Sequence, residues 1–178
     1  GARPPLALLM PGFFPPPPGQ FFYPARAVAE SSPPERRVYR REVQPIFQDP
    51  YEAFNPFYRV DHVLEIPLKR FGLADSKREA QAQIEAALER VGLRPNETLG
   101  RFPHQLSGGQ RQRIGVARAL LCRPRVIVAD EPVSMVDASL RATILASLQV
   151  LHRDFGISIV YITHDLTTAY QICENIVV

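Results

Sequence analysis

The sequence has 178 residues, 46% hydrophobic and 22% charged, which is typical of one soluble globular domain with a substantial core. Its formal net charge of +3 is mild and does not by itself argue for nucleic-acid binding, and no apolar run approaches the ~18 residues of a membrane-spanning helix. Cys122 and Cys173 lie far apart without a CxxC pair, which excludes a disulfide scaffold and predicts two buried thiols in a reducing compartment.

The first 34 residues differ in composition from the rest, because they hold ten of the eighteen prolines of the chain. Four consecutive prolines at 15–18 favour an extended polyproline conformation and exclude a helix interior there. We expect residues 1–34 to be poorly ordered, with a short strand at 20–23. A proline-rich ligand for a partner module is the functional alternative.

Regular patterns begin near Glu35. We expect a short helix at 34–41 and a strand at 43–47, followed by an aromatic, turn-rich loop at 51–58. Packing of these aromatics and contact with a partner explain the loop equally well. The short helix carries the densest basic cluster of the chain, which flanking glutamates dilute, and we interpret the cluster as a solvated face: Arg36, Arg37, Arg40 and Arg41.

A helical region extends from residue 60 to about residue 121. Residues 60–71 have a helical pattern that Pro67 should interrupt. Residues 77–91 form an amphipathic helix that Gly92 ends. Its apolar face comprises Ala80, Ile84, Ala87, Leu88 and Val91.

The most informative stretch of this region is LSGGQRQR at residues 106–113. Ser107 is a good helix N-cap, and Gly108 and Gly109 remove side chains where the backbone turns into the helix. The first N–H groups of a helix lack intrahelical partners and form the positive end of its dipole. The stretch therefore predicts an anion site, most naturally for phosphate.

Strand, helix and strand patterns follow one another over residues 126–163. Apolar strands at 126–129 and 157–163 flank a helix at 140–155, which Gly156 ends. Such a unit builds a parallel sheet with a right-handed crossover, and ligands gather outside the carboxyl ends of its strands. The inward positions of the helix are Leu140, Ile144, Leu148, Leu151 and Phe155.

Polar residues stand at those strand ends. Asp130 and Glu131 follow the first strand, and His164 follows the second. An aspartate there can hold Mg²⁺, and a neighbouring glutamate can accept a proton from water that attacks a phosphate. By themselves, the acidic pair could equally cap the next turn, and a lone histidine at a strand end is more often structural. Gln48, after the strand at 43–47, is unremarkable alone.

Taken together, these motifs resemble those of ABC-type ATPases from about residue 36 to the end. FQDP at residues 47–50 resembles the Q-loop with Gln48, and Asp130 with Glu131 resembles a Walker B motif with its catalytic glutamate. His164 resembles the switch histidine of the family.

Two further motifs strengthen the resemblance. LSGGQ at residues 106–110 is similar to the family's signature motif. Residues 134–137 resemble the D-loop, with Asp137 in place and Val136 where the family usually has leucine. The resemblance implies an α/β fold: a P-loop NTPase (ABC ATPase) core with a parallel sheet, plus an all-α signature subdomain.

The resemblance also implies a domain division. Residues 1–34 would be a proline-rich remnant of the nucleotide-binding core, and residues 35–178 would be the ABC ATPase domain. That domain would comprise the Q-loop region at 35–58, the helical signature subdomain at 59–121 and the Walker B, D-loop and switch-histidine core at 122–178.

The function that the resemblance implies is ATP binding and Mg²⁺-dependent hydrolysis that powers an importer. The motifs look like the branch for oligopeptides and dipeptides, some of whose relatives carry oligosaccharides. The implied partners are a second ABC ATPase subunit, membrane permease subunits and, indirectly, a solute-binding protein, without nucleic acid. The implied location is peripheral, on the cytoplasmic face of the plasma (inner) membrane.

The family also implies roles for individual residues. Glu131 would be the catalytic base, with Gln48 and Asp130 around Mg²⁺ and His164 toward the γ-phosphate. Across the dimer, the signature and D-loop residues would contact ATP held by the partner: Ser107, Gly108, Gly109, Gln110 and Asp137.

One family motif is absent from the sequence. The Walker A loop, G-x-x-x-x-G-K-[ST], occurs nowhere, and the first lysine is Lys69. We therefore expect the chain to be truncated at its N-terminus and to bind ATP poorly alone. The alternative is a degenerate, non-hydrolysing subunit that only lends its signature motif to a partner. A third possibility, an ABC ATPase acting on DNA or ribosomes, is disfavoured by the compact segment between Gln48 and Leu106.

Overall fold

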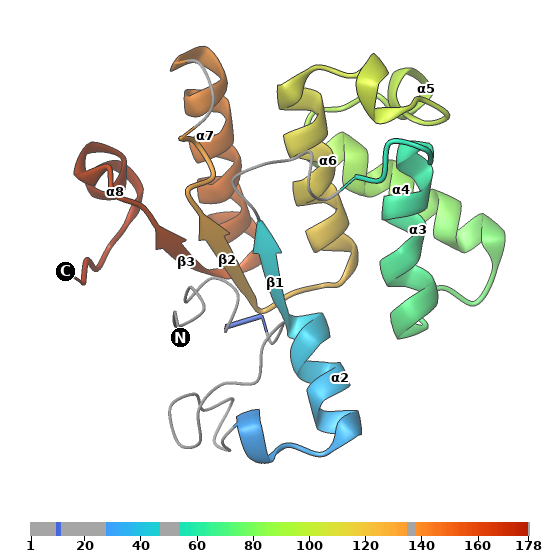
Figure 1. Ribbon diagram of the computed structural model, residues 1–178, viewed down its shortest axis with the longest axis horizontal. Helices are drawn as coiled ribbons and strands as arrows, with labels where there is room; N and C mark the ends of the chain where they lie inside the picture. Colours follow the sequence, from blue (N-terminus) through green and yellow to red (C-terminus); the bar gives the residue numbers. More distant parts are fainter. Residues whose placement is uncertain (1–9, 12–27, 47–53, 135–137, 178) are drawn as a thin grey trace.

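The structure is a computed structural model that describes residues 10–11, 28–46, 54–134 and 138–177. Its described residues form a three-stranded parallel sheet with helices packed against it (Figure 1). The strands lie in the order β1-β2-β3: Val43–Ile46, Val126–Asp130 and Ser158–Ile162. The predicted α/β class with a parallel sheet is confirmed. The predicted polyproline run and the strand at 20–23 lie outside the described residues.

The register of the sheet aligns the strand ends. Val43 lies opposite Val126 on β2, and Val126 lies opposite Ser158 on β3. At the other end Asp130 pairs with Ile162, so the residues that follow β2 and β3 emerge side by side. A parallel arrangement is what brings residues 131 and 164 together, although 32 residues separate them in the sequence.

Side chains of β2 alternate between two apolar clusters, as the pleat of a strand requires. Ile127 and Ala129 belong to the larger cluster, which the helices from residue 60 onward complete. Val128 belongs to a smaller cluster on the opposite face, with Val43 and Tyr39. Tyr39 comes from α2 (Pro33–Glu42), which follows a short 3₁₀ turn, η1 (Val28–Glu30).

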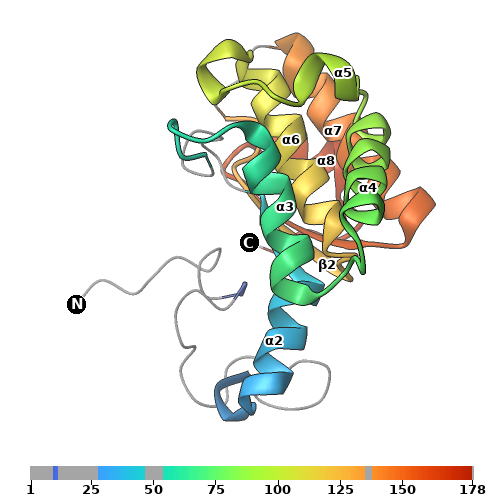
Figure 2. The ribbon, with the colours of Figure 1, turned by 90° about the vertical axis from the view of Figure 1, so that its right-hand side faces the viewer.

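The helical region lies to one side of the sheet (Figure 1). It contains α3 (Val60–Phe71), α4 (Lys77–Arg90), the short α5 (Pro95–Thr98), the 3₁₀ turn η2 (Pro103–Gln105) and α6 (Gly108–Leu121). Figure 2 shows α3, α4 and α6 side by side, and α6 also packs against β1. Helix α6 therefore joins the helical region to the sheet.

Two helices complete the described fold. Helix α7 (Ala138–Phe155) forms the crossover from β2 to β3, and α8 (Leu166–Ile172) follows β3. Ile144, Leu148 and Leu151 of α7 are buried as predicted, whereas nothing is described of the side chain of Leu140. The prediction for Phe155 is wrong: 43% of it is exposed, because it ends the helix beyond the core.

The predicted interruption of the helix at 60–71 is also wrong. Helix α3 is continuous through Pro67, although a proline removes one backbone hydrogen bond. Leu64 and Leu68, one on each side of Pro67, are almost fully buried. Burial of this apolar face holds the helix together where local propensity opposes it.

The remaining expectations concern the surface and the thiols. Arg36, Arg37 and Arg40 are exposed on α2, as a solvated face requires. Cys122 is buried, but Cys173 is only half-buried, because it follows the last turn of α8 rather than lying within it. No helix in the described part of the chain is both long and apolar enough to span a bilayer.

Candidate active site

Glu131 occupies an unusual backbone position immediately after β2. Its φ is +46°, in the left-handed region that residues other than glycine rarely adopt. Its N–H donates to the carbonyl oxygen of Ile162 at 2.9 Å, which continues the pairing of β2 with β3 by one residue. Its own carbonyl oxygen accepts from the N–H and Oγ of Ser134 at 3.2 and 3.0 Å. These bonds hold a strained conformation in place, as is common at functional sites.

His164 holds the Glu131 carboxylate from the end of β3. Glu131 Oε1 accepts a hydrogen bond from the His164 backbone N–H at 2.8 Å and lies 2.7 Å from His164 Nδ1. The side chain of Glu131 is 18% exposed, whereas that of His164 is 82% exposed. Glu131 Oε2 has no hydrogen bond within the described part of the chain. One carboxylate oxygen is thus anchored, and the other is available to accept a proton.

The contact between His164 Nδ1 and Glu131 Oε1 indicates which imidazole nitrogen carries a hydrogen. Because an ionised Glu131 can only accept, Nδ1 of His164 must carry the hydrogen. In a neutral imidazole, Nε2 would then be an acceptor, and it would repel a phosphate oxygen. To donate through Nε2 while it keeps the Glu131 contact, His164 must be protonated on both nitrogens. After release of Glu131, a neutral His164 could donate to a phosphate through whichever ring nitrogen carries its hydrogen.

Asp130 is a half-buried carboxylate at the last position of β2. Burial raises the pKa of Asp130, and the nearby charge of Glu131 raises it further. Its carboxylate accepts no hydrogen bond among the described residues. A half-buried carboxylate that lacks a protein donor fits a divalent cation, because oxygen ligands of this kind suit Mg²⁺. Asp130 would hold the ion, which would supply positive charge beside phosphate oxygens.

The signature residues form the N-terminus of α6 as predicted. Ser107 is the N-cap: its Oγ accepts from the Gln110 N–H at 3.2 Å, and its own N–H donates to Gln110 Oε1 at 2.9 Å. The N–H groups of Gly108 and Gly109 have no acceptor within the described part. The Ser107 hydroxyl hydrogen and these two N–H groups are the donors available to an anion.

The first turn of α6 is braced by residues that the motif analysis left aside. Arg111 is 5% exposed, and its Nη1 donates to the carbonyl oxygens of Pro103 and Leu106 at 2.8 and 2.7 Å. A buried guanidinium therefore fixes the turn that precedes Ser107. Because Arg111 stands between Gln110 and Gln112, nothing in the residue types signals that it is buried.

Helix α6 is also bonded to the loops of the sheet. Gln112, 3% exposed, donates from Nε2 to the carbonyl oxygen of Pro132, the residue after Glu131. Arg118 donates from Nη2 to the carbonyl oxygen of Pro45 on β1 at 3.2 Å. No sequence pattern indicates these two bonds, since a backbone acceptor leaves no trace in the residue types.

The structure thus brings some predicted residues together and leaves others untested. Asp130, Glu131 and His164 meet at the carboxyl ends of β2 and β3. Residues 107–110 form a separate group on α6, and no described hydrogen bond joins them to the first group. Gln48 and Asp137 lie outside the described residues.

Comparison with known proteins identifies relatives of the chain. The family profile for "ABC transporter" matches residues 6–134. The oligopeptide transport ATP-binding protein OppF of Escherichia coli (strain K12) is 40% identical over 146 residues, which are 82% of this chain and 43% of OppF. The glutathione import ATP-binding protein GsiA of Escherichia coli O1:K1 / APEC is 44% identical over 159 residues, 89% of this chain and 25% of GsiA.

Solved structures agree with these matches. The ATP-binding cassette MJ0796, as a post-hydrolysis dimer bound to ADP and Pi, has a TM-score of 0.65 at 28% identity and covers 79% of this chain and 60% of its own. The cbiO1 protein of Clostridium perfringens shares the fold, with a TM-score of 0.76 at 23% identity over 95% of this chain and 65% of its own. The chain spans less than two thirds of each of these proteins. The profile match and the two relatives show that the chain belongs to the ABC transporter family.

Proposed function

We propose that this chain is part of an ATP-hydrolysing subunit that powers an ABC importer. The observation that carries the proposal is the Glu131 carboxylate, which His164 anchors through Oε1 and whose Oε2 accepts no hydrogen bond from the described residues. A carboxylate held in this way can act as a general base with a defined orientation. The relatives OppF and GsiA, whose names specify oligopeptide transport and glutathione import, favour a small peptide as the imported solute.

In the proposed reaction, Glu131 Oε2 accepts a proton from water as the water oxygen bonds to the γ-phosphorus of ATP. The bond from that phosphorus to the β–γ bridging oxygen breaks, and ADP and phosphate are the products. Asp130 and Gln48 would hold Mg²⁺, which would neutralise charge on the phosphates. His164 would position the γ-phosphate and the carboxylate of Glu131.

The proposal assigns the signature group to a second subunit's nucleotide. The donors at Ser107, Gly108 and Gly109 would face the γ-phosphate of ATP held by the partner, with Gln110 and Asp137 beside it. The dimeric cassette among the solved relatives supports such an arrangement. ATP hydrolysis would then require a homodimer or heterodimer of ATPase subunits.

The exposed aromatic residues after the Q-loop support a permease contact. Phe57 is 85% exposed and Tyr58 is 51% exposed, whereas Phe54 is buried in the core. The structure therefore divides the aromatic loop between packing and surface. We propose that Phe57 and Tyr58 face the membrane permease subunits, with the solute-binding protein acting through them. The subunit would then be peripheral on the cytoplasmic side of the inner membrane.

The decisive test is Glu131→Gln in the full-length subunit. Without a base, we expect hydrolysis to fall at least about 100-fold while ATP still binds, so that an ATP-bound dimer accumulates. Steady-state ATPase rates and size-exclusion chromatography with ATP measure both effects. Glu97→Gln on the exposed α5 is the charge-matched control. Hydrolysis at the normal rate in the Glu131 variant would remove this residue as the base.

The second candidate is a non-hydrolysing subunit, a protein that would lack the G-x-x-x-x-G-K-[ST] string over its whole length as this chain does. Such a subunit would contribute only residues 107–110 to a partner's ATP. A mixed dimer separates the two proposals. Loss of hydrolysis after Ser107→Ala, but not after Glu131→Gln, would support the second.

A further inference from the structure

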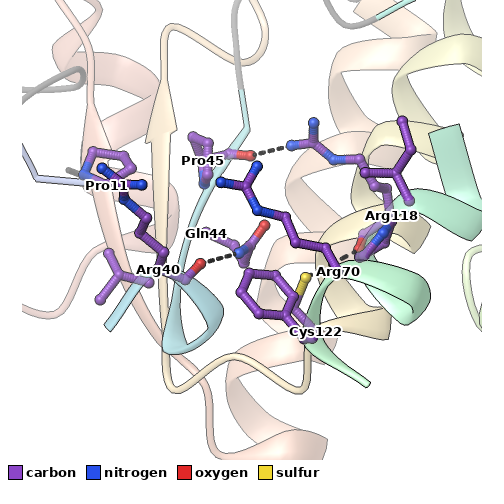
Figure 3. A pocket seen from close by; sticks show the side chains of 11 residues that line it. Pro11, Arg40, Gln44, Pro45, Arg70, Arg118 and Cys122 are labelled. Atoms are coloured by element: carbon purple, nitrogen blue, oxygen red, sulfur yellow. Dashed lines mark hydrogen bonds between the residues drawn. The ribbon is translucent and has the colours of Figure 1, made fainter. Parts of the chain in front are cut away.

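A cavity of about 340 Å³ lies beside β1 (Figure 3). Its lining includes Val43, the first residue of β1, whereas Glu131 follows the last residue of β2. The described lining residues do not include Asp130, Glu131 or His164, so the cavity is separate from the proposed catalytic groups. The volume falls at the small end of the range for small-molecule sites, about 300–1,000 Å³.

Three arginines line this cavity, one from the last turn of each of three helices. Arg40 comes from α2, Arg70 from α3 and Arg118 from α6. Figure 3 shows Arg70 and Arg118 directed toward Pro45 and Arg40 directed toward Pro11. None of the described residues that line the cavity carries a carboxylate. Glu42, the acidic residue closest to Arg40 in the sequence, forms an ion pair with Arg41 at 3.3 Å.

Helix dipoles are the simplest alternative explanation for this arrangement, because arginines near a C-terminus offset its partial negative charge. Other donors, however, already satisfy the carbonyl oxygens concerned. Gln44 Nε2 donates to the Arg40 oxygen at 2.6 Å, and Arg37 Nη2 donates to the Arg70 oxygen at 2.6 Å. Cys122 Sγ donates to the Arg118 oxygen at 3.8 Å. Three full charges also exceed three dipole ends of about half a charge each.

Two of the three guanidinium groups have donors to spare. Among the described residues, Arg118 makes one hydrogen bond, to the Pro45 carbonyl oxygen at 3.2 Å, and its buried Nε has no partner. Burial lowers the pKa of Arg118, which means that its charge lacks full compensation. The side chain of Arg70 has no hydrogen bond or ion pair within the described part. An anion would supply the missing acceptors.

We propose that this cavity binds a phosphate-class anion, either free inorganic phosphate or the phosphate group of a small metabolite, between Arg70 and Arg118, with Arg40 adding charge. A planar guanidinium matches two oxygens of such an anion at once, so two arginines can hold a tetrahedral oxyanion from two sides. The bound anion would connect the helix α2 and the strand β1 to the helices α3 and α6 of the helical region. The site is independent of ATP hydrolysis.

The experiment measures phosphate binding by the 178-residue chain through thermal denaturation and calorimetry. Phosphate is titrated against chloride at equal ionic strength, with and without saturating MgADP, so that a phosphate in a nucleotide site is recognised. Glycerol 3-phosphate in parallel distinguishes an esterified from a free phosphate. Arg70→Met is the principal variant, since Arg70 is exposed and its loss leaves the core intact. Arg118→Lys keeps the positive charge but removes the planar guanidinium, which can bind two oxygens at once.

The matched control is Arg153→Met, which removes an exposed arginine from the last turn of another helix, α7. We expect a saturable increase in melting temperature with phosphate in the presence of MgADP. Affinity should fall at least about tenfold in Arg70→Met and Arg118→Lys, as loss of a charge-assisted hydrogen bond requires, and should stay unchanged in Arg153→Met. A response that matches chloride or that survives Arg70→Met overturns the proposal.

Discussion

At the scale of single residues, two adjacent carboxylates have opposite surroundings. Glu131 is held through Oε1 by two donors from His164, whereas Asp130 has no described donor and a neighbouring negative charge. Their order in the sequence predicts that both belong at a strand end. It does not predict the left-handed φ of Glu131, because that conformation depends on bonds to Ile162 and Ser134 from elsewhere in the fold.

The raised pKa of Asp130 has a consequence for stability. A carboxyl whose native pKa exceeds its unfolded pKa costs the native state free energy once it ionises. That cost is absent below the unfolded-state pKa and is fully present above the native pKa, and so at neutral pH. A bound divalent cation would offset the cost, because it stabilises the ionised carboxylate.

Asp130→Asn should therefore stabilise the metal-free protein at pH 7 while it removes the ion. We expect the melting temperature without metal to rise by about 1–2 °C and the shift on adding Mg²⁺ and nucleotide to disappear. In the full-length subunit, ATPase activity should fall at least about 100-fold. Asp154→Asn, at an exposed position of α7, is the control. A lower melting temperature at pH 7 would contradict this account of Asp130.

At the scale of secondary structure, α4 and α6 begin with equivalent serine caps. Ser76 Oγ accepts from the Glu79 N–H at 3.1 Å, and Ser107 Oγ accepts from the Gln110 N–H at 3.2 Å. The caps have the same chemistry, but only α6 carries unpartnered glycine N–H groups beside its cap. A comparison of Ser76 with Ser107 therefore separates the contribution of a cap to helix stability from a contribution to ATP binding.

Replacing either serine with alanine should lower the free energy of unfolding by about 1 kcal/mol, since each change removes one cap. Only Ser107→Ala should also reduce ATP hydrolysis by the assembled subunits, by about tenfold or more. Chemical denaturation and ATPase rates measure the two effects. Equal loss of activity in Ser76→Ala would mean that the N-terminus of α6 acts on hydrolysis through stability alone.

Errors in the predicted elements have a common cause. The sequence indicates α4 and its apolar face well, because period and caps agree there. The predicted helix break at Pro67 is wrong, because the local sequence does not reveal the burial of Leu64 and Leu68 that keeps α3 continuous. The predicted burial of Phe155 is also wrong. Phe155 has the spacing of the inward positions, but it lies beyond the end of the core, where the Arg90 guanidinium covers its ring at 5.2 Å.

At the scale of the whole molecule, the parallel sheet and its ligand-binding edge follow from the strand-helix-strand pattern. The position of α6 does not, because its contacts with α3, α4 and β1 are all distant in sequence from its own motif. The domain boundaries proposed at residues 58 and 121 stay predictions. Since α6 packs on the sheet and on the helices, it contacts the parts of the chain on both sides of the boundary at residue 121.

The 178-residue chain alone should bind ATP weakly. Its sequence has no Walker A string, and its signature donors serve a nucleotide held by another subunit in the proposed function. We expect the monomeric chain to bind MgATP with a Kd weaker than about 100 µM, as measured by calorimetry or by displacement of a fluorescent nucleotide. Micromolar affinity in a monomer would show that the chain forms its own nucleotide site.

The two bonds from α6 to the sheet, at Pro132 and Pro45, both end on backbone carbonyl oxygens. Such an acceptor is the same whatever residue occupies its position. Evolution can therefore change residues 45 and 132 without loss of these bonds, while Gln112 and Arg118 have few substitutes that donate over the same reach. Paired changes between homologues will not reveal the contact between α6 and the sheet, because only the donor of each bond is a side chain.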